Sequence, residues 1–366
     1  MKKLLLVTLQ GANIGNRLQN YALQRIFEKM GFKVFTPYYN IPQCDTFIKR
    51  SKLRVKSLLG ALGIKKYSYE FIMAKRRLVF LRFDRKYIHN RFKISFSRRK
   101  AINTEKYAAA VCGSDQIWHK WSEDKNELRY FYLDFMPRDK RIAYAASFGF
   151  EAFEKEDIRL HREGINGIAF LSCRERSGQR LIKELTGRNA ILAADPTLLI
   201  SANEWKSIEK KPSFKFPERY ILAYYLGGIS EEAQNETKAF AQSRGLKIIS
   251  IFDPVQMKYF YTSPDEFLWL VHHAEYVFTN SFHACAFSVI FQKRFMAFRR
   301  CEKGMEGMFD RIESLLESLD MGDCIFSGNI TLLDQQSQNS DIDNKLEIIK
   351  KESLSFLKEG LKNHRR

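Results

Sequence analysis

Short apolar runs alternate with helical patterns along most of this chain. Each run is continuous rather than alternating, which is typical of strands buried on both faces of a parallel sheet. In the first half we predict strands at 4–9, 33–36, 107–112, 142–147, 169–173 and 190–194. Between the first two, apolar residues recur at helical spacing from Leu18 to Met30, and Gly31 ends this helix. Strand, glycine-containing turn, helix and strand in this order are typical of the start of a Rossmann-like domain.

The same rhythm restarts after a polar stretch at 209–217, which we interpret as a linker. Strands are predicted at 220–226, 246–252, 275–279 and 294–298, and a last amphipathic helix at 341–363. We therefore expect an α/β protein made of two doubly wound, Rossmann-like domains, at 1–208 and 218–330. A ligand is expected to bind in the cleft across which the two domains face each other.

The net charge of the chain indicates the kind of partner that it binds. The 366 residues carry a formal net charge of +19, which favours an acidic partner such as nucleic acid, an anionic membrane or a phosphorylated substrate. A basic insert at about 45–100 holds most of it: residues 49–100 contain 18 Lys and Arg against Glu70 and Asp84. Apolar residues at helical spacing lie between them. The insert is thus either a peripheral contact with an anionic membrane or a helical element packed on its own domain.

Other classes of function are disfavoured. The chain has no helix-turn-helix pattern and no RNA-stacking aromatic signature, so we expect no nucleic acid partner. Its longest apolar runs are too short to span a membrane, and residues 2–9 do not continue as a signal peptide. The six cysteines are scattered, and neither they nor His272 and His273 show a metal-binding spacing. We expect a cytoplasmic enzyme with reduced thiols, without a metal or a cofactor.

Polar residues follow several predicted strands. The turn at 11–16 places backbone N–H groups at a helix start, which either binds an anion or is a simple tight turn. Amides at Asn13, Asn16 and Gln19 suit a ligand rich in hydroxyl groups. Asp115 follows another strand as ligand contact or helix cap. Arg174 could grip a phosphate or carboxylate, or form an ion pair with an acid nearby.

His283 follows the most informative of these strand ends. Polar Thr279, Asn280 and Ser281 lead into an apolar helix, and His283 lies in the first turn of that helix. Such a histidine could face the cleft and act as a general acid or base near neutral pH. The alternative is a histidine satisfied within the core.

Taken together and in this order, these segments resemble the polysaccharide pyruvyl transferase family. The similarity extends from about residue 4 to residue 298. It is carried by Asn13-Ile14-Gly15-Asn16-Arg17-Leu18-Gln19-Asn20, Gly113-Ser114-Asp115-Gln116-Ile117-Trp118, Ala145-Ala146-Ser147-Phe148-Gly149, Arg174-Glu175, Asp195-Pro196-Thr197-Leu198-Leu199 and Thr279-Asn280-Ser281-Phe282-His283. Many members have Thr-Asp-Arg-Leu-His at the last segment. Ser281 therefore stands where they carry an arginine, which leaves the second anion contact to backbone N–H groups or a lysine.

The resemblance implies transfer of pyruvate from phosphoenolpyruvate to two hydroxyls of a sugar, giving a cyclic ketal and phosphate. It also implies the paired-Rossmann, glycosyltransferase B-like arrangement. The expected catalytic residues are His283 and Asp115. The expected donor-binding residues are Arg174, Asn280, Ser281, Gly15 and Asn16, and the expected acceptor-binding residues are Asn13, Gln19, Ser114 and Trp118. A membrane-bound insert would suit a lipid-linked acceptor at the inner face of the cytoplasmic membrane. The alternative function is a nucleotide-sugar-dependent glycosyltransferase of the same architecture.

Overall fold

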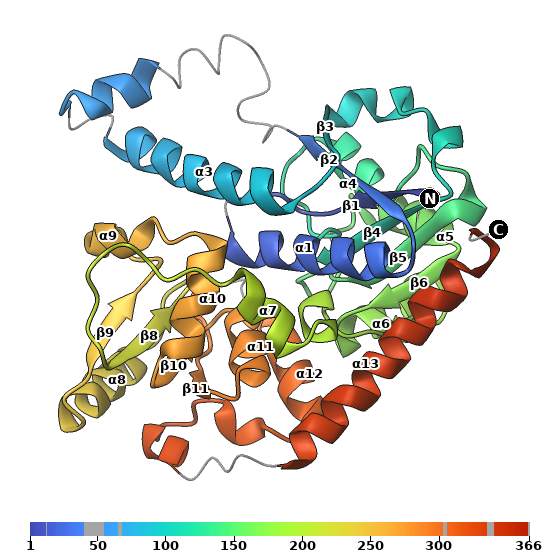
Figure 1. Ribbon diagram of the computed structural model, residues 1–366. Helices are drawn as coiled ribbons and strands as arrows, with labels where there is room; N and C mark the ends of the chain where they lie inside the picture. Colours follow the sequence, from blue (N-terminus) through green and yellow to red (C-terminus); the bar gives the residue numbers. More distant parts are fainter. Residues whose placement is uncertain (12, 40–54, 65–67, 303–305, 335–339, 365–366) are drawn as a thin grey trace.

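The computed structural model describes all residues except 12, 40–54, 65–67, 303–305, 335–339 and 365–366. Two parallel sheets, each covered by helices, build the molecule (Figure 1). The first sheet has the strand order β3-β2-β1-β4-β5-β6-β7. Its strands are β1 (Lys3–Val7), β2 (Lys33–Tyr39), β3 (Arg91–Ile94), β4 (Ala109–Asp115), β5 (Arg141–Ala146), β6 (Phe170–Cys173) and β7 (Ile191–Leu192).

The second sheet has the order β11-β10-β8-β9. Its strands are β8 (Tyr220–Tyr224), β9 (Lys247–Ser250), β10 (Tyr276–Thr279) and β11 (Arg294–Ala297). In each sheet the chain reverses its direction of growth beside the first strand, between β1 and β4 and between β8 and β10. In doubly wound sheets, ligands bind outside the carboxyl ends of the strands at such a reversal. The expected pair of Rossmann-like units is therefore confirmed, and each offers one such edge.

Helices cover both sheets and connect them. They are α1 (Ile14–Lys29), α3 (Ser68–Tyr87), α4 (Lys125–Phe131), α5 (Ile158–Asn166), α6 (Arg176–Thr186), α7 (Ala202–Ile208), α8 (Glu231–Ser243), α9 (Met257–Phe260), α10 (Pro264–His273), α11 (Phe282–Ile290), α12 (Asp310–Ser318) and α13 (Ser340–Gly360). The long α13 returns from the second unit to the first (Figure 1), where Ser353 accepts a hydrogen bond from the backbone of Ala194. None of the described helices combines the length and apolar character needed to cross a bilayer.

Burial explains why the predicted strands are continuous apolar runs. Leu4 and Leu6 of β1 belong to one core, while Leu5 and Val7 belong to the core on the other face of the sheet. The first of these cores continues into the second unit. At the junction, Trp205 of α7 packs against both units: its ring lies 5.5 Å from that of Tyr21 in α1 and 4.9 Å from that of Phe287 in α11. The two units are thus joined by apolar packing as well as by the chain.

The basic insert departs from the expectations in its details. β2 continues through Pro37 to Tyr39, and β3 within the insert pairs with this extension. Pro37 is tolerated because the pairing of β1 with β2 has already ended at Phe35. The parts of the predicted insert at 45–54 and 65–67 lie outside the described residues.

Candidate active site between the two sheets

A buried cluster of charged side chains lies at the carboxyl edge of the first sheet. Arg174, which follows β6, donates to Asp115 at the end of β4 (Nη2–Oδ1 2.9 Å) and to Asp195 after β7 (Nη1–Oδ2 2.6 Å). Arg311 of α12 reaches the same Oδ1 of Asp115 at 3.4 Å. The guanidinium of Arg174 also lies over the ring of Phe282, 4.4 Å from its centroid. Because α11 and α12 belong to the second unit, the cluster joins both units.

His283 enters this cluster from the second unit. Its Nε2 lies 3.7 Å from Oδ2 of Asp195 and has no hydrogen-bond partner among the described residues. On its other side the ring touches Gly15, where an added Cβ would lie 2.0 Å from Nδ1. Glycine at this position lets the start of α1 approach the imidazole, so His283 is held between the two units.

The start of α1 closes the cluster across the strand reversal of the first sheet. Asn13 caps the helix by accepting a hydrogen bond from the backbone of Gly15 at 2.8 Å. One turn later, Nδ2 of Asn16 donates to Oδ2 of Asp115 at 2.5 Å. A side chain that follows β1 is therefore bonded to one that ends β4, at the edge where ligands of such sheets bind.

Electrostatics fix the charge state of each group. Burial by itself raises the pKa of Asp115, but Arg174, His283 and Arg311 outweigh it and hold the pKa of this carboxyl well below its usual range. The pKa of Asp195 is likewise lowered, since His283, Arg174 and hydrogen bonds from Thr197 outweigh its burial. Burial lowers the pKa of His283 by more than Asp195 and Asp115 raise it. The site thus holds two carboxylates beside an imidazole that is neutral at pH 7.

The sequence-predicted site residues divide into two groups. His283, Asp115, Arg174, Gly15 and Asn16 come together in the cluster. The remaining residues lie around it: Asn13 caps α1, Asn280 bonds to the backbone of Leu226 and Gly227, Ser281 precedes α11, and Ser114 donates to Asp195 at 2.9 Å. These neighbours shape the backbone or orient the cluster.

Two of the predicted acceptor contacts lie too deep for that role in this structure. Trp118 is fully buried, stacked on Tyr132 with ring centroids 5.3 Å apart and packed against Phe148. Gln19 is also fully buried, and its Oε1 accepts from the backbone of Ser114 at 3.1 Å. The indole of Trp118 belongs to the core, and the amide of Gln19 connects α1 to β4. Neither side chain therefore exposes surface that a sugar could contact.

Sequence reasoning missed two members of the cluster as site residues. Asp195 was named only within one of the segments that carry the resemblance, without a role in the site, yet its carboxylate meets Ser114, Arg174 and Thr197. Arg311 was not considered. A signal was present, because Arg311 and Leu315 share the face of α12 that is buried, and an arginine in such register needs a partner or a ligand.

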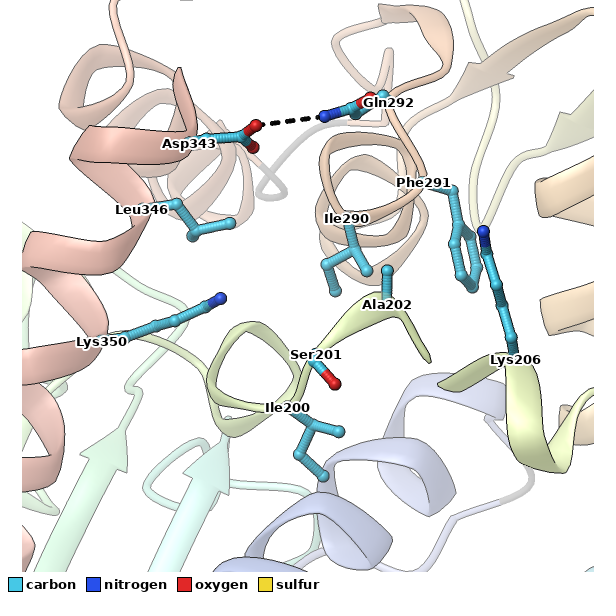
Figure 2. A pocket seen from close by; sticks show the side chains of 10 residues that line it. All are labelled: Ile200, Ser201, Ala202, Lys206, Ile290, Phe291, Gln292, Asp343, Leu346 and Lys350. Atoms are coloured by element: carbon cyan, nitrogen blue, oxygen red, sulfur yellow. Dashed lines mark hydrogen bonds between the residues drawn. The ribbon is translucent and has the colours of Figure 1, made fainter. Parts of the chain in front are cut away.

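Two further features lie elsewhere. Among the described residues, Glu209, His272 and His273 form a group whose ligand atoms could hold a metal ion. A pocket of about 280 Å³ opens beyond the carboxyl end of α11, between Phe291, Ser201 and the inward-pointing Leu346 and Lys350 of α13 (Figure 2). His283 starts the same helix, and nine residues of helix span roughly 13 Å, so this pocket is separate from the charged cluster.

Comparisons with known proteins agree with this architecture. The family model described as polysaccharide pyruvyl transferase matches residues 13–302. No curated protein matches the chain. Among solved structures, one described as a UDP-N-acetylglucosamine 2-epimerase from Listeria monocytogenes aligns with TM-score 0.53 and 10% identity, over 99% of this chain and 97% of that one. UDP-GlcNAc 2-epimerase from Neisseria meningitidis aligns with TM-score 0.49 and 9% identity, over 99% of each chain. At such identity the likeness shows the fold alone, the glycosyltransferase B-like pairing of two Rossmann-like domains.

Proposed function

This chain belongs to the polysaccharide pyruvyl transferase family and is a transferase, and we propose that it moves pyruvate from phosphoenolpyruvate to two hydroxyl groups of a sugar acceptor. The observation that carries the proposal is the placement of His283. This neutral, buried imidazole of the second unit lies 3.7 Å from Asp195 of the first, beside two arginines and at both strand reversals. Arginines suit the carboxylate and phosphate of the donor, and a neutral imidazole can accept a proton from a hydroxyl.

The chemistry can be written with one proton carrier. His283 takes the proton of the first sugar hydroxyl as its oxygen bonds to C2 of phosphoenolpyruvate. The imidazolium gives this proton to the methylene carbon, which becomes methyl, and His283 is neutral again. The C2–O bond to phosphate then breaks, and the electron pair leaves with the phosphate. The second hydroxyl attacks C2 and gives up its proton to the neutral imidazole, which closes the ketal. The proton passes to the released phosphate or to water.

The carboxylates have supporting roles in this scheme. Asp195 stands on the Nε2 side of His283 and stabilises the imidazolium that forms during transfer. Asp115 stays ionised because Arg174 and Arg311 lower its pKa, so it accepts hydrogen bonds and orients neighbouring donors. No step requires either aspartate to become protonated.

The basic insert supports a second part of the proposal, contact with an anionic membrane. On α3, Arg76, Phe80 and Phe83 are buried against the protein, and Arg76 donates to the backbone of Phe260. The rest of the insert exposes large apolar side chains, namely Val55, Leu58, Leu62, Ile64, Tyr69, Phe71, Leu78 and Leu81.

Exposed basic residues accompany this apolar surface, among them Lys75, Arg82, Arg85 and Lys86 on α3. Apolar side chains flanked by cations suit a negatively charged lipid interface, where each basic residue contributes about 1 kcal/mol. Such contact would bring the enzyme to an acceptor carried on a lipid. One face of α3 is thus packed on the protein, as one sequence-based interpretation expects, and the exposed face is the one that we propose for the membrane.

The decisive experiment is a comparison of donors. The purified protein is incubated with candidate glycans and either phosphoenolpyruvate or nucleotide sugars, and released phosphate and nucleotide are quantified. We expect phosphate release from phosphoenolpyruvate together with a product whose mass has gained one pyruvate ketal. Nucleotide release with transfer of a sugar would instead assign the chain to the glycosyltransferases of the same fold.

A further inference from the structure

We infer that Arg311 is the second anion-binding guanidinium of the donor site and takes the place of the arginine that many family members carry at the position of Ser281. The inference rests on the proposed function for the identity of the donor. Arg311 lies beyond residues 13–302, the segment that the family model matches, and it comes from α12 rather than from the start of α11.

Arg174 is already paired with carboxylates of the protein. Both of its terminal nitrogens bind carboxylates, Asp115 at 2.9 Å and Asp195 at 2.6 Å. Two carboxylates offset its single positive charge, and only its Nε is without a partner among the described residues. A donor with a carboxylate and a phosphate therefore needs a further cation.

Arg311 has N–H donors that are poorly used within the protein, unlike the two terminal nitrogens of Arg174. It is 5% exposed, yet its Nη1 lies 3.4 Å from Asp115 and its Nη2 3.3 Å from the backbone oxygen of Met308, both longer than ordinary N–H···O bonds. Its Nε has no hydrogen-bond partner among the described residues. Burying a guanidinium with its donors so poorly satisfied costs stability, which is typical of a group kept for a ligand.

Arg99 shows what a purely structural arginine looks like in the same protein. It is also 5% exposed, but all three of its nitrogens donate. Two bonds of 2.6 Å reach Asp134, and further bonds of 3.0 and 2.9 Å reach the backbone of Phe96 and the side chain of Asn126. Arg99 and Arg311 are therefore equally buried, but only Arg99 has all its nitrogens in well-formed hydrogen bonds.

The charges around Arg311 also favour an anion. Burial and the neighbouring guanidinium of Arg174 lower its pKa to about 10, Arg300 acts in the same direction, and the facing acids are Asp115 and Glu175. Arg174 and Arg311 thus share the carboxylate of Asp115, and Arg300 adds a further positive charge near Arg311. An anion with planar or tetrahedral oxygens placed against this group would relieve the repulsion and match the fork of the guanidinium.

Contacts between the units hold Arg311 in place. Asp310, the preceding residue, accepts a hydrogen bond from Ser177 of α6 at 2.5 Å, and Glu317 pairs with Arg176 at 3.2 Å. These bonds connect α12 of the second unit to α6 of the first. The arginine therefore reaches the site from a helix in contact with both units, whereas the buried side chain of Ser281 is short and uncharged.

The test compares Arg311→Met and Arg311→Lys with Arg299→Met, a matched control because Arg299 is exposed and pairs with Glu313. Affinities for phosphoenolpyruvate and for inorganic phosphate are measured by calorimetry, and melting temperatures are recorded. We expect Arg311→Met to weaken both ligands about 10- to 100-fold, Arg311→Lys to recover part of the loss, and the control to match the native protein. The melting temperature of Arg311→Met should not fall, because a poorly satisfied buried charge is removed.

Unchanged affinity for both ligands in either folded Arg311 variant would overturn the inference, as would a fall in melting temperature without a loss of affinity. Arg311→Lys decides the question if Arg311→Met does not fold. Failure of the proposed function gives a different result. Native protein that binds phosphate but not phosphoenolpyruvate would reject the donor, while the phosphate measurement would still test Arg311.

Discussion

Gly15 and His283 are in direct contact across the two units, so close that a Cβ on residue 15 would lie 2.0 Å from Nδ1 of the imidazole. We predict that Gly15→Ala displaces the ring and lowers kcat at least about tenfold, since small misplacements of a catalytic group are costly. Stability should also fall, because three atoms of the buried ring would lie within 2.6 Å of the new Cβ and must shift, at a cost of about 1–3 kcal/mol. The helix preference of alanine over glycine, about 0.5–1 kcal/mol, offsets this cost only in part. Steady-state kinetics and thermal melts would measure both effects. Gly322→Ala is the control, as a Cβ there meets nothing within 4 Å, and equal kinetics for the two variants would refute the prediction.

His283→Ala is expected to lower kcat by about 10²–10⁴-fold while leaving the protein folded, because the variant has lost its proton carrier. Phosphate release from phosphoenolpyruvate is the measurement, with circular dichroism as the check on folding. His273→Ala, at an exposed position, serves as the control. A collapse of the melting temperature in His283→Ala would favour the core-histidine interpretation.

The pH dependence follows from the direction of the shift at His283. Burial lowers its pKa, so the neutral form that accepts a proton persists below the ordinary histidine value of about 6.5. We expect kcat to be constant near neutrality and to fall with acid only below that value. A kcat profile whose acid limb is centred above pH 7 would contradict a neutral base at this position.

Arg174→Ala should destabilise the fold as well as weaken the donor. The substitution leaves Asp115 and Asp195 as buried carboxylates without their shared partner, which typically costs about 3–5 kcal/mol. Urea unfolding at pH 7 would measure the loss. The exposed neighbour Arg176→Ala is the control and should change the free energy of unfolding by less than about 1 kcal/mol.

The ion pair of Arg174 with Asp115 also predicts how the stability of the protein depends on pH. In the native protein the depressed pKa of Asp115 contributes stability that is present above its unfolded value of about 3.9 and is lost as the pH falls through the folded value. Without Arg174 the pKa of Asp115 rises and this contribution shrinks. Stability of Arg174→Ala should therefore depend less on pH below 5, and an unchanged pH dependence would place the charge balance elsewhere.

Membrane contact is tested with vesicles. We expect the protein to co-sediment with phosphatidylglycerol vesicles at low salt and to be released as salt rises, because screening weakens the attraction of Lys and Arg. Leu58→Asp and Leu62→Asp should weaken binding, while Val255→Asp, at an exposed apolar site outside the insert, should not. Equal recovery with neutral and anionic vesicles would reject this part of the proposal.

The sequence alone determined the order of elements and much of the site. Continuous apolar runs such as that of β1 can be read directly, because a strand buried on both faces tolerates no polar position. Residues at the carboxyl ends of such strands meet at one edge, so His283, Asp115 and Arg174 could be grouped in advance. The second strand was predicted to end at residue 36, but it continues through Pro37 to Tyr39, because β1 no longer pairs with β2 there and needs no N–H from residue 37.

Only the tertiary structure decided which charged side chains of the site are paired within the protein and which have donors left for a ligand. Arg174 was expected to grip an anion or to form an ion pair with a nearby acid, and the structure pairs it with two aspartates from distant segments. The structure places Trp118 in the core and Arg311 in the cluster. The helical register of Arg311 with Leu315 indicated burial, but it could not indicate which partner Arg311 meets. The hydrogen bonds and ion pairs of Arg174 and Arg311 depend on residues far away in the chain. Asp115, which both contact, is about 60 residues from Arg174 and about 200 from Arg311. Because a linear pattern encodes the elements but not their contacts, only the packed chain reveals them.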